Sequence, residues 1–290
     1  MAELQFAAPE TVNQAIKILG GAKGKGRILA GGTDLLVQMR SGRIEPGFIV
    51  DVKNIPELTE IKKEKNGYRV GAAVSGARLG EHKSVKKKWP GVVEALELIG
   101  STQIQGRASL GGNLCNGSPA ADSVPAMIAA GATCKIAGPK GRRTAKVEDI
   151  VTGPGKTSLK KGEFIISFLL PEKPKKSSEA YLRLIPRTEM DIAVVGAGVS
   201  LTLDSQGICT KARVALGAVA PKPVLVEEAG LILVGSKLDP GTLEKMASAC
   251  RAACNPIDDM RGTVEYRTKV AGVLATRATK IAAERVRSGR

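Results

Sequence analysis

The sequence predicts an α+β protein in which two N-terminal lobes precede a smaller C-terminal α+β domain. The chain has 290 residues, which exceeds the roughly 100–200 residues that one domain usually holds. Short strand-like runs alternate with amphipathic helical segments, and 34 glycines indicate many turns. Residues 171–178 are rich in Pro, Lys and Ser, which is typical of a linker. We therefore divide the chain into residues 1–54, 55–175 and 176–290.

The first of these segments predicts a small lobe with a βαβ-like order. Proline is tolerated in the first turn of a helix, so Pro9 is a plausible helix start. Gly31-Gly32 ends a strand, and Thr33 is placed to cap the helix that follows it. We expect strands near Phe6 and over residues 27–30 and 48–52, with helices that begin at Pro9 and after Thr33.

The rest of the chain predicts a second lobe and a separate C-terminal domain. Asn66-Gly67 is a typical hairpin turn, and Pro90 fits the first position of a helix. In the second lobe we expect strands over residues 58–61, 68–72, 133–136 and 164–169, and helices over residues 76–83, 90–99 and 121–130. In the C-terminal domain we expect strands over residues 192–203 and 211–219, a helix over residues 242–253, and a long helix after Pro256.

The formal net charge of +16 suits an anionic partner or cofactor. Nucleic-acid binding is disfavoured, because only 3% of the residues are aromatic and single strands need aromatic side chains to stack on. The basic residues are also scattered, with the densest clusters at residues 83–88 and 173–176. Charge alone leaves an acidic protein, a membrane surface and an anionic cofactor open.

The five cysteines are an odd number and include no C-x-x-C pair. This pattern argues against a disulfide framework and a structural zinc site, and it favours a reducing compartment. The sequence contains neither a secretory signal pattern nor an apolar run long enough to span a membrane. We therefore expect a cytoplasmic protein without a transmembrane segment.

Two glycine-rich stretches carry the functional signal. The first, residues 29–35, places Gly31-Gly32 between a strand and a helix. Glycine has no Cβ, so an anion can approach the main chain closely and accept hydrogen bonds from backbone N–H groups. The stretch matches neither G-x-G-x-x-G nor a P-loop. Taken alone, it is equally well explained as a tight strand-to-helix turn.

The second stretch, residues 109–113, repeats this pattern, and Asp122 follows closely. Ser109 and Asn113 can donate side-chain hydrogen bonds to phosphate oxygens, and Asp122 can accept from ribose or ribityl hydroxyls. Asp122 is equally well placed to cap a helix that begins at Ser123. Two anion cradles together predict a diphosphate-containing ligand.

These residues resemble the FAD-binding subunits of molybdenum hydroxylases, the xanthine dehydrogenase and carbon monoxide dehydrogenase type. The resemblance covers nearly the whole chain, and the combination of its motifs is highly specific. It rests on residues 30–36, on residues 108–113 with Ser118-Pro119 and Asp122, on Gly153-Pro154-Gly155-Lys156-Thr157, and on residues 256–261 with Glu265-Tyr266-Arg267.

The resemblance implies a two-lobed FAD-binding domain of the PCMH/vanillyl-alcohol-oxidase type, formed by residues 1–175, and a C-terminal domain of the carbon monoxide dehydrogenase flavoprotein type. Ile165 would be an apolar wall beside the flavin, or an ordinary core residue. Arg183 would stabilise a reduced anionic flavin, or form a surface salt bridge. The implied FAD-binding residues are Leu29, Ala30, Gly31, Gly32, Thr33, Asp34, Leu35, Ser109, Gly111, Gly112, Asn113, Asp122, Ile165 and Arg183.

The resemblance also implies a larger assembly, a dimer of heterotrimers. A large molybdopterin subunit would oxidise the substrate, and a small subunit would carry the electrons through two-iron, two-sulfur clusters. FAD on this chain would pass them to an acceptor such as NAD or a quinone. We expect no metal ligands and no catalytic residue on the chain itself, because it has no cysteine cluster and its single histidine, His82, has no acid–base partner.

Two alternatives remain open from the sequence. One is a free-standing FAD-dependent oxidoreductase with its own substrate pocket, which requires an acid or base near the flavin ring. The other is a non-catalytic basic module in which both glycine-rich stretches bind nucleic-acid phosphates.

Overall fold

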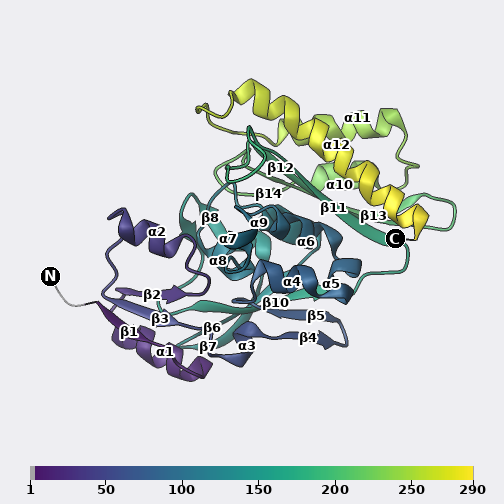
Figure 1. Ribbon diagram of the computed structural model, residues 1–290. Coiled ribbons are helices and arrows are strands. Elements are labelled where there is room, and N and C mark those ends of the chain that lie inside the picture. The colour runs from purple at the N-terminus through teal and green to yellow at the C-terminus, as the bar shows by residue number, and fades with distance from the viewer. Residues whose placement is uncertain (1–3, 290) are drawn as a thin grey trace.

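The computed structural model describes residues 4–289, and its N-terminal lobe is built on a three-stranded parallel sheet (Figure 1). The strand order β1-β3-β2, with β3 parallel to both neighbours, confirms the βαβ-like prediction. The elements of this lobe are β1 (Gln5–Ala7), α1 (Val12–Gly21), β2 (Gly26–Leu29), α2 (Leu35–Arg40) and β3 (Phe48–Asp51).

Both predicted helix starts in this lobe are wrong in detail. Helix α1 begins at Val12 rather than Pro9, because Thr11 forms a capping box at its N-terminus. Thr33 does not cap α2, since Asp34 occupies the N-cap position and itself makes no side-chain cap bond. The N-terminus of α2 is therefore left uncapped beside the glycines.

The second lobe contains an antiparallel sheet of order β4-β5-β10-β6-β7, and helices α4–α9 lie above this sheet in Figure 1. Strands β8 and β9 form a separate two-stranded sheet. The strands are β4 (Ile61–Glu64), β5 (Gly67–Gly71), β6 (Thr133–Gly138), β7 (Gly141–Lys146), β8 (Val151–Gly153), β9 (Lys156–Thr157) and β10 (Phe164–Pro171). The helices are α3 (Pro56–Thr59), α4 (Gly76–Glu81), α5 (Lys83–Lys88), α6 (Pro90–Glu97), α7 (Thr102–Gln105), α8 (Leu110–Cys115) and α9 (Ser123–Ala129).

Two segments of this lobe differ from their predictions. The strand expected over residues 58–61 is wrong, because Pro56 starts the short helix α3 and the strand begins only at Ile61. Most of the second glycine-rich stretch lies inside helix α8, which Ser109 caps by accepting a hydrogen bond from the Gly112 N–H. The hairpin at Asn66-Gly67 is confirmed, since β4 and β5 pair up to Glu64 and Gly67.

The C-terminal domain is an antiparallel sheet of order β11-β12-β13-β14 covered on one face by three helices. Strand β11 begins within the predicted linker, at Ser177, and the strand expected from residue 192 begins at Val195. Residues 185–194 therefore form a loop between β11 and β12. The elements are β11 (Ser177–Leu184), β12 (Val195–Leu203), β13 (Cys209–Gly217), β14 (Val224–Leu225), α10 (Glu227–Leu233), α11 (Pro240–Ala252) and α12 (Val264–Ser288).

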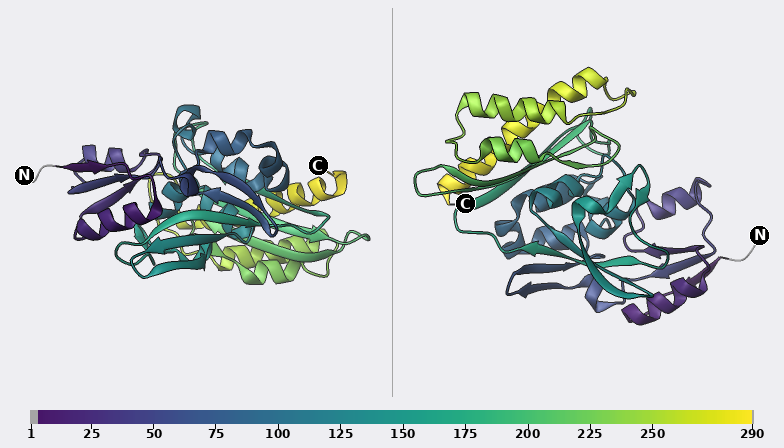
Figure 2. Two further views of the ribbon diagram at one scale, coloured as in Figure 1. Left: turned by 90° about the horizontal axis from the view of Figure 1, so that it is seen from below. Right: turned by 180° about the vertical axis from the view of Figure 1, so that it is seen from behind.

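The layers alternate between sheet and helix through the molecule. Helices α6 and α9 of the second lobe pack against strands of the C-terminal sheet, and α12 packs on the other face of that sheet. The core of the N-terminal lobe includes Phe164 and Ile166 from β10, so this lobe is joined to the second sheet by shared apolar side chains. Figure 2 shows the N-terminal lobe and the C-terminal helices at opposite ends of the molecule. Within residues 4–289 we find no helix with the length and apolar character needed to cross a membrane.

Candidate functional site

A cleft of about 1050 Å³ opens between the N-terminal lobe and the second lobe. Its volume is at the upper end of the range usual for small-molecule sites, about 300–1,000 Å³. The walls come from the N-terminal end of α2, from α8, from the start of α9, from β10 and from the β11–β12 loop. All the residues predicted to bind the cofactor line this cleft except Leu29 and Arg183.

The first glycine-rich stretch presents a row of free backbone donors to the cleft. In the described part of the chain, none of the N–H groups of residues 31–35 donates a hydrogen bond, and the first bond of α2 runs from the Leu36 N–H to the Gly32 carbonyl at 3.0 Å. Backbone N–H groups that lack a protein partner are suited to the oxygens of a phosphate group. This row therefore supplies five backbone donors, all from residues that line the cleft, that an anion could use.

Each of the two glycines in this row is required for a different structural reason. Gly32 has φ +80°, a left-handed conformation that side chains with a Cβ rarely adopt. Gly31 lies so close to the segment before α8 that a Cβ would stand 1.9 Å from the carbonyl oxygen of Arg107. Gly31 thus brings the two glycine-rich stretches side by side.

The second glycine-rich stretch does not repeat the chemistry of the first. The Gly111 N–H donates to the Ala72 carbonyl at 3.1 Å, and the Gly112 and Asn113 N–H groups both donate to Ser109. Gly111 is needed for packing, because a Cβ there would lie 2.5 Å from the Ala72 carbonyl oxygen. A Cβ on Gly112 would meet only the Ser109 Oγ, at 3.3 Å, so this position faces the cleft.

Although its backbone N–H is bonded to Ser109, Asn113 can donate a hydrogen bond from its side chain. Its Oδ1 accepts hydrogen bonds from the Ser123 N–H at 3.2 Å and from the Ser123 hydroxyl at 2.7 Å, at the start of α9. These contacts fix which end of the amide faces the helix and leave the Nδ2 group free to donate. The hydroxyl proton of Ser109 is a second donor in this wall, since its Oγ acts only as an acceptor in the N-cap.

Asp122 occupies the N-cap position of α9 but does not cap it, so that explanation of the residue is wrong. Its Oδ1 accepts from the Tyr181 hydroxyl, and its Oδ2 accepts from the Arg183 guanidinium, each at 2.9 Å. Burial raises the pKa of Asp122 to about 6, although Arg183 and Tyr181 act in the opposite direction. The carboxylate is held at the cleft with lone pairs still available for a hydroxyl group.

Of the two residues predicted to lie near the flavin, Ile165 lines the cleft and Arg183 does not. Ile165 lines the cleft from β10 and is also a core residue, so both descriptions of it apply. The Arg183 side chain is only 4% exposed and pairs with Asp122, and its Nε is buried without a hydrogen-bond partner. Its salt bridge is therefore buried rather than on the surface, and its charge acts first on the Asp122 carboxylate.

Sequence patterns missed the part of the cleft that comes from the β11–β12 loop. Met190, Asp191 and Ile192 line the cleft, and the Met190 N–H donates to the Gly100 carbonyl at 3.3 Å. The sequence placed Ile192 at the start of a predicted strand and assigned neither Met190 nor Asp191, whereas in the structure Met190 turns the loop with φ +53°. His82 lies outside the cleft lining and accepts from the Val85 N–H as the N-cap of α5.

Two family models together match nearly all of the chain. The model described as the FAD binding domain in molybdopterin dehydrogenase matches residues 2–173, and the model described as the CO dehydrogenase flavoprotein C-terminal domain matches residues 180–282. These two models meet between the second lobe and the C-terminal sheet.

Individual relatives extend over the same length. The carbon monoxide dehydrogenase medium chain of Afipia carboxidovorans is 34% identical over 283 residues, which are 98% of each chain. The xanthine dehydrogenase FAD-binding subunit of Escherichia coli O157:H7 is 31% identical, covering 95% of this chain and 94% of the relative. A crystal structure of Cu,Mo-CO dehydrogenase in its cyanide-inactivated form superposes with a TM-score of 0.94 at 33% identity, covering 97% of this chain and 98% of that one.

Proposed function

Because the chain belongs to the family of FAD-binding subunits of molybdenum hydroxylases, we propose that it is the electron-transfer flavoprotein of such a complex and holds FAD in the cleft between its lobes. The observation that carries this proposal is the row of unbonded N–H groups over residues 31–35, which faces a cleft large enough for a dinucleotide. A purely structural turn would not need so many free donors in one place.

The residues of the cleft fit the parts of FAD. The N–H groups of residues 31–35 bind the pyrophosphate, and the Nδ2 of Asn113 and the hydroxyl of Ser109 add donors from the adjacent second glycine-rich stretch. The Asp122 carboxylate accepts hydrogen bonds from the hydroxyl-bearing chain of the cofactor. Ile165 provides an apolar surface for the ring system.

Bound FAD joins one-electron carriers to a two-electron acceptor. This chain has to hold and orient the cofactor and shield it from water, and the proposed relay requires no acid–base residue of it. We propose that electrons arrive from two-iron, two-sulfur clusters on a small partner subunit and leave to an acceptor such as NAD or a quinone. A large partner subunit carries the molybdopterin and oxidises the substrate, and the complex is a dimer of heterotrimers.

Two further parts of the proposal concern the chain as a whole. We infer that residues 1–54 and 55–175 are the lobes of the FAD-binding domain and that residues 176–290 are the C-terminal domain. The family models, one ending at residue 173 and the other beginning at residue 180, support the second of these two boundaries. The five cysteines are all free thiols, which suits the cytoplasm.

A pair of glycine variants tests the placement of FAD. We expect Gly112→Val to abolish FAD binding, because the new side chain enters the cleft where the cofactor lies. Gly20→Val is the matched control, since Gly20 is also in a helix and a Cβ there would have no neighbouring atom within 4 Å. FAD binding is measured by fluorescence titration of the FAD-free protein. Equal FAD affinity in the two folded variants would contradict this placement.

Purification from the native host tests the assembly. We expect the chain to co-purify with a molybdenum-containing subunit and an iron–sulfur subunit. A chain that purifies alone and turns over a substrate without a molybdenum-bearing partner would refute the subunit assignment and favour the free-standing flavoprotein.

A further inference from the structure

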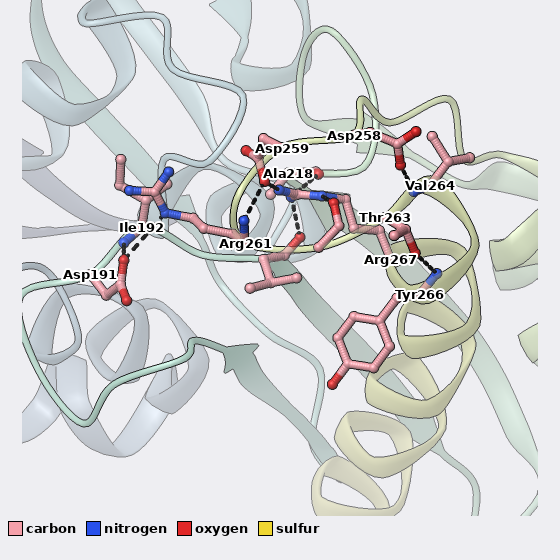
Figure 3. A network of polar contacts seen from close by, with 12 residues as sticks. Asp191, Ile192, Ala218, Asp258, Asp259, Arg261, Thr263, Val264, Tyr266 and Arg267 are labelled. Carbon is pink, nitrogen blue, oxygen red and sulfur yellow. Dashed lines mark hydrogen bonds and ion pairs between the residues drawn. The ribbon is translucent and has the colours of Figure 1, made fainter.

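The segment before α12 contacts the wall of the cleft through Arg261. The Arg261 Nε donates to the Asp191 Oδ1 at 3.3 Å, and Asp191 lines the cleft from the β11–β12 loop (Figure 3). Arg261 precedes α12, so a residue far along the chain contacts the wall of the site. The Arg187 Nε pairs with the other carboxylate oxygen, Oδ2, also at 3.3 Å.

Arg261 is itself held in a fixed turn before α12. Its N–H donates to the Asp259 carboxylate at 2.8 Å, and Asp259 and Gly262 are bonded through their backbones. Arg267, in the first turns of α12, pairs with the same Asp259 Oδ1 at 2.6 Å. The buried Arg267 guanidinium also donates to the Val194 carbonyl, at the end of the β11–β12 loop, at 2.7 Å. One network thus anchors both the turn and the loop.

Asp191 transmits this anchoring to its neighbours in the loop. Its side chain is only 7% exposed, although residues 186–190 before it are exposed. Its Oδ1 accepts from the Ile192 N–H at 2.8 Å, which fixes the backbone at the point where the loop turns into the cleft. This backbone hydrogen bond, together with Arg261 and Arg187, lowers the pKa of Asp191, so the carboxylate keeps its charge at neutral pH.

The loop carries two large apolar side chains at the cleft. Met190 is 55% exposed and Ile192 is 52% exposed, and both line the cavity on either side of Asp191. Exposed apolar side chains beside a cavity lose unfavourable contact with water when a ligand covers them. Both side chains can cover a ligand only while the loop is held in place, and Asp191 is the residue between them that ties the loop to Arg261.

We propose that Arg261 is a positioning residue for the cofactor site: through Asp191 it holds Met190 and Ile192 against bound FAD, so that the C-terminal domain slows FAD release. This inference rests on the proposed function. It assigns to residues 258–267 the role of supporting the loop that lines the cleft, in addition to their packing around Arg267.

The test measures the rate at which FAD leaves the full-length protein, followed by the rise in flavin fluorescence after dilution. We expect Arg261→Gln and Asp191→Asn each to speed release by about two- to five-fold, the range expected from losing one partly exposed ion pair. The double variant should release FAD no faster than the more affected single variant, because both changes break the same contact. Arg261→Lys keeps the charge and should restore part of the slow release.

Arg251→Gln is the matched control. Arg251 pairs with Glu244 in the same domain but away from the cleft, so its loss should leave the release rate unchanged even where it lowers the melting temperature. Wild-type protein that retains FAD, with variants at Arg261 and Asp191 that release it at the wild-type rate, would overturn the positioning role and leave the FAD site intact. Failure of the wild-type protein itself to bind FAD would overturn the proposed function first, and this inference with it.

Discussion

Variants that remove the Asp122 carboxylate, with and without its partner Arg183, should distinguish its contribution to protein stability from its contribution to FAD binding. Asp122 and Arg183 form a 2.9 Å ion pair whose side chains are 9% and 4% exposed. Among the described residues, Asp122 is the one side chain or backbone group to which Arg183 donates a hydrogen bond, and the Arg183 Nε is already buried without a partner. In Asp122→Ala the guanidinium group therefore stays buried without a counter-charge.

The buried ion pair and the lost hydrogen bond determine the expected loss of stability and the expected loss of FAD affinity. We expect Asp122→Ala to lower the free energy of unfolding of the FAD-free protein by about 3–5 kcal/mol, the usual result of removing one member of a buried ion pair. The lost hydrogen bond from a cofactor hydroxyl to a charged group is worth about 1.5–3 kcal/mol, so its loss should raise the Kd for FAD by about 10- to 150-fold. In Asp122→Ala/Arg183→Met no unpaired charge remains, so stability should return to within about 1–2 kcal/mol of wild type while FAD affinity stays low.

Urea unfolding of the FAD-free proteins, followed by circular dichroism, measures the stabilities, and fluorescence titration measures the FAD affinities. Asp122→Ala should have both a lower unfolding free energy and a lower FAD affinity than wild type, whereas Asp122→Ala/Arg183→Met should differ from wild type mainly in its FAD affinity. The reasoning is refuted if Asp122→Ala is as stable as wild type, or if the double variant binds FAD as tightly as wild type does.

Three further predictions concern the pKa of Asp122, the packing of Gly31 and the hydrogen bonds of Arg267. Burial raises the pKa of Asp122 from 3.8 to about 6, so the unfolding free energy of the FAD-free protein, relative to Asp122→Asn, should be highest below pH 3.8 and should fall to a lower plateau as the pH rises through about 6. A pH-independent difference in unfolding free energy between the two proteins would contradict this. Gly31→Ala places a Cβ 1.9 Å from the Arg107 carbonyl oxygen and should lower the melting temperature, whereas Gly20→Ala should raise or preserve it. Arg267→Met leaves the acceptors of a 4% exposed guanidinium without a donor and should lower the free energy of unfolding by about 2–4 kcal/mol in urea, a result that a loss below about 1 kcal/mol would rule out.

Local features of the chain were predictable from the sequence. Gly31-Gly32 ends a strand and starts a turn because glycine permits a positive φ and close backbone approach, and both properties act within a few residues. The hairpin at Asn66-Gly67 is predictable for the same reason. The structure of residues 58–61 was harder to predict, because the apolar Leu58 is compatible with either a strand or a helix. In the structure Pro56 occupies the first turn of helix α3, which includes Leu58.

The details of the cleft depend on contacts between distant residues. The Gly111 N–H donates to the Ala72 carbonyl and is therefore not available to a ligand. The Asp122 carboxylate accepts hydrogen bonds from Tyr181 and Arg183 on β11. No local sequence pattern can identify these distant partners. The cleft-lining role of Asp191 likewise depends on the fold, which brings the distant Arg261 to it. Sequence patterns therefore predicted which residues line the cleft better than which of their atoms lack a hydrogen-bond partner within the protein.

The absorption spectrum of the purified full-length chain tests the central claim most directly. We predict a flavin spectrum in stoichiometric amount, with FAD identified in the supernatant after denaturation. A folded, full-length protein that is colourless and stays without flavin after incubation with excess FAD would contradict the account.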